Sequence, residues 1–178
     1  ILWALSSVLA GLGIAAALLI SLNLRGEEPL PAAETLQSTP ALAQRGEYLA
    51  RVGNCMACHT TPGGAPFAGG RGIETPFGVV HSSNLTPDRA QGIGSWTSAD
   101  FWRAMHHGRS KDGRLLVPAF PYPNYTQVTR EDSDAIFAYL QSVPAAADAN
   151  RAHALRFPYN TQAALAVWRA LFFAPGAP

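Results

Sequence analysis

The sequence CMACH, Cys55-Met56-Ala57-Cys58-His59, decides the fold. Its two cysteines are three positions apart, so both thiols lie on the same side of a helical turn, and a histidine follows directly. This C-x-x-C-H pattern is the signature for covalent attachment of a c-type haem. Each thiol forms a thioether with one vinyl group, and the histidine binds the iron. The sequence therefore predicts one haem c, with Cys55 and Cys58 as thioether residues and His59 as the proximal iron ligand.

A close cysteine pair has two other common uses, as a redox-active dithiol and as half of a zinc site. A redox pair is typical of a βαβ pattern, which is absent around Cys55, and zinc needs more ligands than the sequence offers there. The chain contains two cysteines, too few for a four-cysteine zinc or iron–sulfur centre. Haem attachment is therefore the favoured interpretation.

The composition sets the limits around this motif. A chain of 178 residues can form one compact domain with attachments, and its 16 glycines and 14 prolines favour a loop-rich domain over a plain helix bundle. The net charge of +1, without a basic stripe, argues against nucleic acid as a partner. The sequence has no nucleotide-binding glycine fingerprint and no catalytic triad pattern.

Residues 1–22 carry no charge, and read ILWALSSVLAGLGIAAALLISL. A helix needs about 20 apolar residues to cross a bilayer. A cleaved signal peptide and a buried core helix are the alternatives, but the apolar run exceeds the usual signal core of about 7–15 residues and has no A-x-A-type cleavage site near Leu22. We expect a retained transmembrane anchor at 1–22, followed by a polar, proline-bearing linker at 23–40.

The predicted haem domain covers residues 41–145. Apolar spacing, capping boxes and glycine or proline stops predict three helices in it, at 41–52, from the Thr97–Asp100 capping box to Gly108, and from the Thr129–Asp132 capping box to Val143. The stretch 61–95 has no sustained helical or strand period and predicts a long irregular loop. Residues 146–178 predict a linker with a short apolar segment at 162–173, too short to span a bilayer.

Three stretches in order carry a resemblance that runs from about Arg45 to Pro144. They are GEYLARVGNCMACHTTPGGAPFAGG, TPFGVVHSSNLTPDRAQGIGSW and DGRLLVPAFPYPNYTQVTREDSDAIFAYLQSVP. Together they resemble the first haem domain of the cytochrome c subunits of bacterial membrane-bound dehydrogenases. That group serves alcohol, gluconate and aldehyde dehydrogenases and some molybdenum hydroxylases, such as those acting on nicotinate.

The resemblance implies an all-α, class I cytochrome c fold, a small shell of helices around the haem. Its first and last helices cross near the haem edge, and Gly46 would permit a close approach to Phe137 or Tyr139. The attachment residues of the group carry over to the two cysteines and the histidine of CMACH.

One departure from the group concerns the distal iron ligand. Members commonly have Met in a loop reading PAMPY, and here Phe120 takes that place, in PAFPY. Another residue then binds the iron, or the iron is five-coordinate, or water or an exogenous ligand binds. We favour His106 as the distal ligand, with Met105 as the alternative, because His and Met are the usual axial ligands. Core packing for Met105 and a helix C-terminal role for His107 are the structural alternatives.

The resemblance also suggests contacts for the haem propionates. The indole N–H of Trp96 is one candidate donor, and anchoring the following helix is the alternative role of this residue. Arg71 and Arg109 are further candidates. His81 and His153 lie in loops, where surface positions are expected, and Met56 is expected to pack.

The function implied by the resemblance is electron transfer without catalysis by the chain itself. Electrons come from a dehydrogenase catalytic subunit, with or without an iron–sulfur subunit, and pass to other cytochromes, quinone or a terminal oxidase. The expected location is the inner membrane, with a single span, lipid around it and the haem domain in the periplasm. An open sixth site, in a gas sensor or peroxidase-like protein, is the alternative, and a tethering role is a third.

Overall fold

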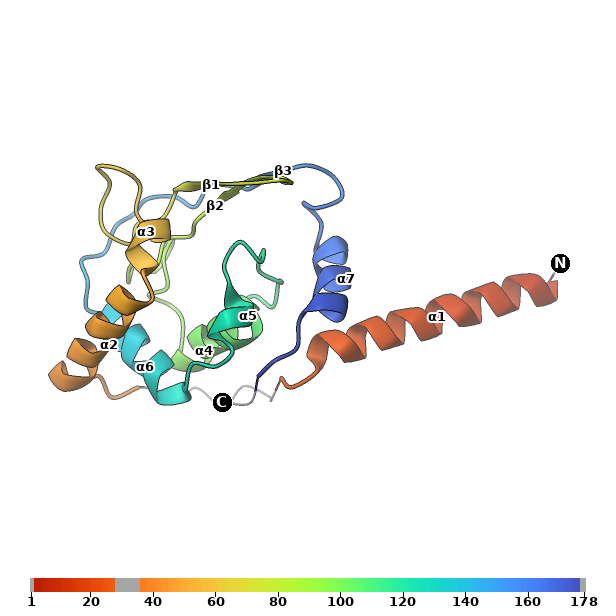
Figure 1. Cartoon of the computed structure of the whole chain (residues 1–178), viewed down its shortest axis with the longest axis horizontal. Coiled ribbons are helices and arrows are strands. Elements are labelled where there is room, and N and C mark those ends of the chain that lie inside the picture. The colour runs from red at the N-terminus through yellow and green to blue at the C-terminus, as the bar shows by residue number, and fades with distance from the viewer. Residues whose placement is uncertain (1, 28–35, 177–178) are drawn as a thin grey trace.

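The computed structural model describes residues 2–27 and 36–176, and Figure 1 shows a rounded domain from which one long helix projects. The elements follow in the order α1 (Leu2–Leu24), α2 (Pro40–Val52), α3 (Cys55–His59), β1 (Gly72–Thr75), β2 (Gly78–His81), α4 (Ser98–His107), α5 (Tyr122–Tyr125), α6 (Arg130–Leu140), β3 (Ala154–Leu155) and α7 (Gln162–Phe172).

Helices α2 and α6 cross at Gly46 with their backbones in close contact. A Cβ atom at this position would lie 1.8 Å from the carbonyl oxygen of Ala135 and 2.9 Å from the Cβ of Tyr139. Only glycine leaves room for the Ala135 carbonyl, because a side chain would force the helices apart. The expected approach to Tyr139 is therefore confirmed, and Ala135 makes the closer contact.

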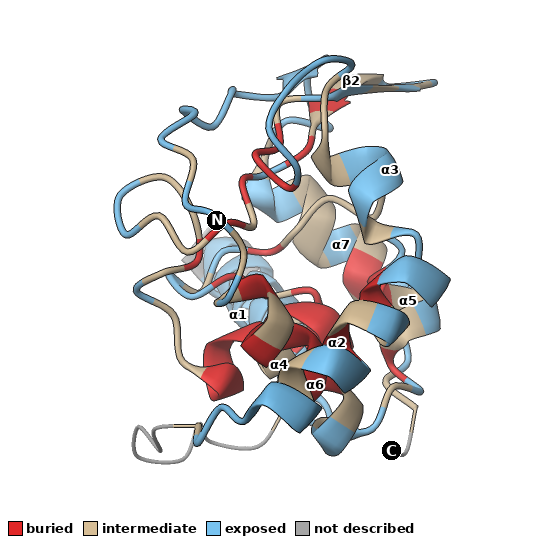
Figure 2. Ribbon diagram, turned by 90° about the vertical axis from the view of Figure 1, so that its left-hand side faces the viewer, coloured by how far each residue is buried: buried red, intermediate tan, exposed pale blue. Residues whose placement is uncertain are grey.

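A single apolar cluster fills the space between α2, α4 and α6. Its buried members come from these three helices and from the intervening loops, and Figure 2 shows buried residues concentrated on α4 and α6. They are Ala50, Phe67, Ile93, Phe101, Met105, Ile136, Phe137 and Leu140. The edge-on and tilted ring contacts of Phe67 with Tyr139 and of Phe101 with Phe137 add specific packing to this burial.

The sequence signals place α4 correctly. The Oγ1 atom of Thr97 accepts a hydrogen bond from the Asp100 N–H at 3.1 Å, and an Asp100 carboxylate oxygen accepts one from the Thr97 N–H at 2.9 Å. This is the predicted capping box, and Gly108 ends the helix in the left-handed region with φ 61°. At α6, Thr129 caps the first turn, but the helix ends at Leu140, three residues before the predicted end at Val143.

The fold is not all-α, because a three-stranded antiparallel sheet lies across one side of the domain (Figure 1). Strands β1 and β2 form a hairpin inside the stretch expected to be irregular, and β3 adds to β2 from the C-terminal segment. The two hairpin strands have four residues each and β3 has two. Strands this short do not establish an alternating pattern, which explains why the sequence did not predict them.

The C-terminal segment is part of the domain rather than a free linker. The side chain of Asn84 donates to the carbonyl oxygens of Ala146 and Asp148, and the side chain of Asn150 accepts from the Asn84 N–H. Helix α7 then follows β3 and reaches the end of α1. Residues 146–155 therefore complete the layer that covers the 61–95 stretch.

Helix α1 extends past the predicted end of the anchor, to Leu24. It contains one stretch, Leu5–Leu24, that is long and apolar enough to cross a membrane by length and composition. The following residues, to Glu27, contact the domain: the Arg25 side chain donates to the Phe173 carbonyl oxygen at 2.6 Å. The first part of the expected linker is thus packed, and residues 28–35 lie outside the described residues.

Candidate functional site

The CMACH motif forms the whole of the short helix α3. Asn54 precedes it in the left-handed region, with φ 53°, and turns the chain from α2 into α3. Cys55 is half-buried and packs against the apolar cluster, whereas Cys58 is exposed, and both are free thiols. Burial raises the pKa of the Cys55 thiol, and the neighbouring Cys58 raises it further.

The imidazole of His59 is oriented by the backbone of the next loop. Its Nδ1 lies 2.7 Å from the Ser83 carbonyl oxygen. A carbonyl only accepts, so Nδ1 carries the proton and the lone pair of the ring is on Nε2. Burial lowers the pKa of His59 and outweighs the opposing effect of this hydrogen bond. A neutral histidine with one nitrogen held by a carbonyl is the arrangement that iron-binding histidines need, so these residues fit a haem.

Aromatic side chains line the approach to the cysteines. The Tyr125 hydroxyl donates to the Gly53 carbonyl oxygen at 3.1 Å, and the Phe120 ring stacks on Tyr125 with centroids 5.4 Å apart. Both rings pack against the same apolar cluster as Cys55. Phe120 has no atom that can bind iron, so this position provides apolar packing.

The contacts of the two candidate distal ligands differ. Met105 is 6% exposed and belongs to the cluster against which Cys55 and Phe120 pack. The His106 ring stacks on Trp102, its Nδ1 lies 3.2 Å from the Nε2 of His107, and its Nε2 lies 3.4 Å from the Thr126 hydroxyl. Both nitrogens of His106 therefore face other side chains. These contacts weigh against the favoured residue and support Met105.

Trp96 is half-buried beside the cluster, and within the described residues its indole N–H has no hydrogen-bond partner. It therefore retains a donor for a propionate. Arg71 is exposed, at the turn before β1. Arg109 is already engaged: its Nε donates to both carboxylate oxygens of Glu27, at 2.9 and 3.0 Å.

The remaining candidates lie toward the surface. His81 and His153 contact each other's segments, since the His153 Nδ1 accepts from the His81 N–H at 3.2 Å. Met56 is 44% exposed, so the expectation that it packs inside the domain is wrong. A side chain at the second position of a single helical turn faces away from the cysteines, which explains its exposure.

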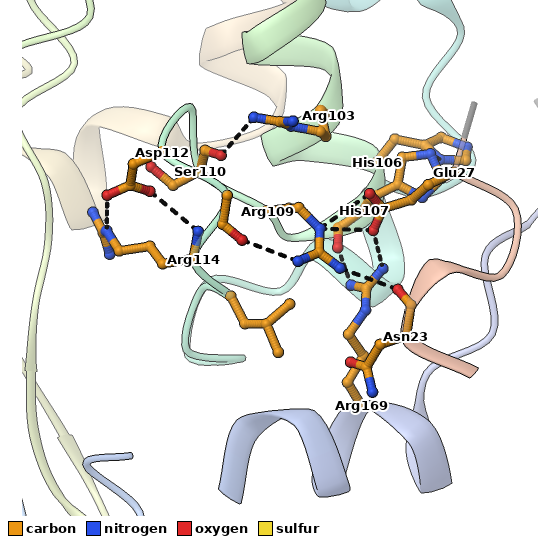
Figure 3. A network of polar contacts seen from close by, with 12 residues as sticks. Asn23, Glu27, Arg103, His106, His107, Arg109, Ser110, Asp112, Arg114 and Arg169 are labelled. Atoms are coloured by element: carbon orange, nitrogen blue, oxygen red, sulfur yellow. Dashed lines mark hydrogen bonds and ion pairs between the residues drawn. The ribbon is translucent and has the colours of Figure 1, made fainter. Parts of the chain in front are cut away.

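The ion pair of Arg109 is part of a polar network that the sequence did not reveal (Figure 3). Glu27 also accepts from the Arg169 Nη2 at 3.0 Å, and Arg169 donates to the His107 carbonyl oxygen. Burial, the adjacent His106 and nearby arginines lower the pKa of His107 to about 4, which keeps this ring neutral at pH 7. Glu27 and Arg169 are 142 positions apart, so no local pattern indicates their pairing.

Comparison with known proteins extends the geometry. A family model described as cytochrome c matches residues 43–144. The chain is 46% identical over 137 residues to the gluconate 2-dehydrogenase cytochrome c subunit of Pantoea cypripedii, a match that covers 76% of this chain and 31% of the relative. It is 41% identical to the cytochrome c subunit of the quinone-dependent alcohol dehydrogenase of Gluconacetobacter polyoxogenes, over 79% of this chain and 30% of the relative.

A third relative is a subunit of the nicotinate dehydrogenase of Pseudomonas putida, which is 43% identical over 76% of this chain and 12% of its own length. The chain thus spans less than one third of the length of each of these three relatives. The resemblance inferred from the three sequence stretches is confirmed. The chain belongs to the cytochrome c family, and it is related to the cytochrome c subunits of gluconate, alcohol and nicotinate dehydrogenases.

Proposed function

We propose that the chain is an electron-transfer subunit with one haem c, bound through Cys55 and Cys58, and that it catalyses no bond-making or bond-breaking itself. Haem c, when bound, supplies a one-electron iron couple. The observation that carries the proposal is the 2.7 Å contact of the His59 Nδ1 with the Ser83 carbonyl oxygen, which leaves Nε2 as a ligand atom. The single C-x-x-C-H sequence in the chain supports one haem.

We favour Met105 over His106 as the distal ligand. Met105 lies on α4 four residues after Phe101, and both side chains belong to the buried cluster beside Cys55 and Phe120. A thioether needs no hydrogen-bond partner, so it can reside in this apolar cluster, whereas an imidazole there would lose the contacts that His106 makes. A methionine ligand raises the haem potential.

A second candidate function is that of a gas sensor or peroxidase-like haem protein with an open sixth site. The observation that favours it is Phe120, which replaces the methionine of the related loops with a side chain that cannot bind iron. The apolar stack of Phe120 on Tyr125 supports the electron carrier instead, since it excludes water and offers no polar group to an exogenous ligand.

Carbon monoxide distinguishes the two functions. The full chain with its haem is reduced and mixed with carbon monoxide at neutral pH, and the visible spectrum is followed. For an electron carrier with a bound distal ligand, the spectrum stays that of the reduced protein over seconds. Rapid conversion to a carbon monoxide adduct would support the sensor or peroxidase-like function.

The relatives' names suggest the partner. We infer that a dehydrogenase catalytic subunit, with or without an iron–sulfur subunit, delivers the electrons, and that other cytochromes, quinone or a terminal oxidase accept them. The apolar stretch Leu5–Leu24 supports a single-span anchor in the inner membrane, surrounded by lipid. The haem domain, residues 41–145, then lies in the periplasm.

A further inference from the structure

Helix α7 has its polar and apolar faces reversed relative to a helix that faces water. Its one charged residue, Arg169, is 1% exposed and points inward. The outward side chains are apolar: Val167 is 48% exposed, and Leu171 and Phe172 are each 69% exposed. An exposed apolar face of this kind needs a cover that water does not provide.

The inward face of α7 is fixed to the domain, so the outward face cannot turn in. The Arg169 guanidinium pairs with Glu27 at 3.0 Å and lies over the Phe173 ring, 4.3 Å from its centroid. Trp168 and Phe173 pack edge-on against Tyr122 of α5. Figure 3 shows Arg169 pointing from α7 toward Glu27 and Arg109. The orientation of the helix about its own axis is therefore set by buried contacts.

Helix α7 also lies at the end of α1. The Asn23 Nδ2 donates to the Ala166 carbonyl oxygen in the middle of α7 at 3.0 Å. A groove of about 290 Å³ between the two helices is lined in part by Leu19, Ile20 and Ala166. In Figure 1, α7 runs across the end of α1, and α7 and the loop before it form the edge of the domain toward which α1 projects.

The length of α1 sets the level of this contact. The stretch Leu5–Leu24 has 20 residues. At a rise of about 1.5 Å per residue it spans about 30 Å, the thickness of the hydrocarbon core of a bilayer. Asn23, near its last residue, therefore falls at the boundary between hydrocarbon and water, and α7 lies at that boundary across the direction of the span.

We propose that α7 is an interfacial helix, whose Val167, Leu171 and Phe172 side chains insert into the surface of the bilayer that α1 spans. This inference rests on the membrane anchoring proposed above. Lipid is the occupant that continuity favours, because the apolar surface of α1 leads directly to that of α7. Interfacial helices of this type bury their apolar face about 5–10 Å deep in the headgroup region. Two attachments, one spanning and one lying flat, then fix the orientation of the haem domain to the membrane.

A photoreactive phospholipid tests the proposal. The full chain with its haem is reconstituted into vesicles of phosphatidylcholine and phosphatidylglycerol that contain a phospholipid with a diazirine in its acyl chain. After irradiation, lipid adducts are mapped by mass spectrometry. We expect adducts on α1 and on α7 and none on α2, the matched control, where Tyr48 and Val52 are each 67% exposed. Leu171→Glu should reduce the yield on α7 several-fold and leave the yield on α1 unchanged.

Adducts on α1 but none on α7 would overturn the proposal, with water or another protein as the cover. A dimer mass under the same conditions would then identify a second copy as that cover. Adducts on neither helix would remove the membrane anchoring itself, and the interfacial helix with it. Equal labelling of α2 and α7 would also contradict it, because the lipid would then be reacting with any exposed apolar side chain.

Discussion

The position of His59 depends on a loop that is held from behind by one amide side chain. Ser83 accepts from the His59 Nδ1, and the next residue, Asn84, is 2% exposed. The Asn84 side chain donates to two carbonyl oxygens of the C-terminal segment, and its own oxygen accepts from the N–H and the hydroxyl of Thr86, at 2.8 and 2.7 Å. The C-terminal segment thus supports the loop that orients the candidate iron ligand.

Asn84→Ala should lower the free energy of unfolding by about 3 kcal/mol, because it leaves several buried donors and acceptors unpaired at about 1–3 kcal/mol each. Chemical denaturation of the haem-loaded chain measures the loss. Asn124→Ala, at an exposed position, is the control and should cost less than about 0.5 kcal/mol. Equal effects of the two substitutions would show that Asn84 does not support the loop.

The sequence predicted the attachment residues because their spacing is itself the chemical requirement. It did not predict the contact between His59 and Ser83, because the acceptor is a backbone carbonyl and any residue type supplies one. It also favoured His106 over Met105, since a row of ligand residues on one helix does not reveal which side chains face the apolar cluster. That distinction came from the contacts of His106 with Trp102 and Thr126.

At the scale of elements, the crossing of α2 and α6 holds the domain together beside the motif. Helix α2 leads directly into α3 through Asn54, so any change in the crossing displaces the cysteines. The crossing depends on backbone contact at Gly46, where the missing side chain admits the Ala135 carbonyl.

Gly46→Ala should destabilise the domain by about 3 kcal/mol, because an added methyl group in a filled site forces backbone movement. Thermal unfolding of the haem-loaded protein is the measurement. Gly53→Ala provides the control: its Cβ would meet no atom closer than 3.3 Å, and a loss below about 1 kcal/mol is expected. A wild-type midpoint for Gly46→Ala would mean that the helices cross elsewhere.

Elements with local signals were predicted and those without were not. Helix α4 has a capping box at one end and a left-handed glycine at the other, both close in sequence to its core side chains. The sheet has no such signals, because β3 comes from the C-terminal segment, far from β2 in sequence, and contributes two residues. Tertiary contact, rather than local propensity, determines these strands.

At the scale of the whole molecule, one carboxylate joins three parts of the chain. Glu27 follows α1, Arg109 follows α4, and Arg169 belongs to α7; the side chains of Glu27, Arg109 and Arg169 are 10%, 16% and 1% exposed. A buried carboxylate shared by two guanidinium groups is lost only at high cost, because each cation would remain in a site of low dielectric constant. This network fixes α1 and α7 to the domain.

Glu27→Gln keeps the shape of the side chain and removes its charge. We expect a loss of about 3 kcal/mol, since two buried arginines then lack a counter-charge. Unfolding by urea in detergent micelles gives the value. Glu47→Gln, which removes the exposed pair with Arg51, should cost less than about 0.5 kcal/mol. If both variants unfold at the wild-type midpoint, the network does not fix α1 to the domain.

Near-infrared magnetic circular dichroism of the oxidised, haem-loaded chain tests the proposed electron carrier most directly, because its charge-transfer band separates His/Met from His/His ligation. With His59 and Met105 as axial ligands, the protein gives a His/Met band, Met105→Leu abolishes it and His106→Gln leaves it in place. A His/His band, or a high-spin spectrum in the unaltered protein, would contradict this assignment.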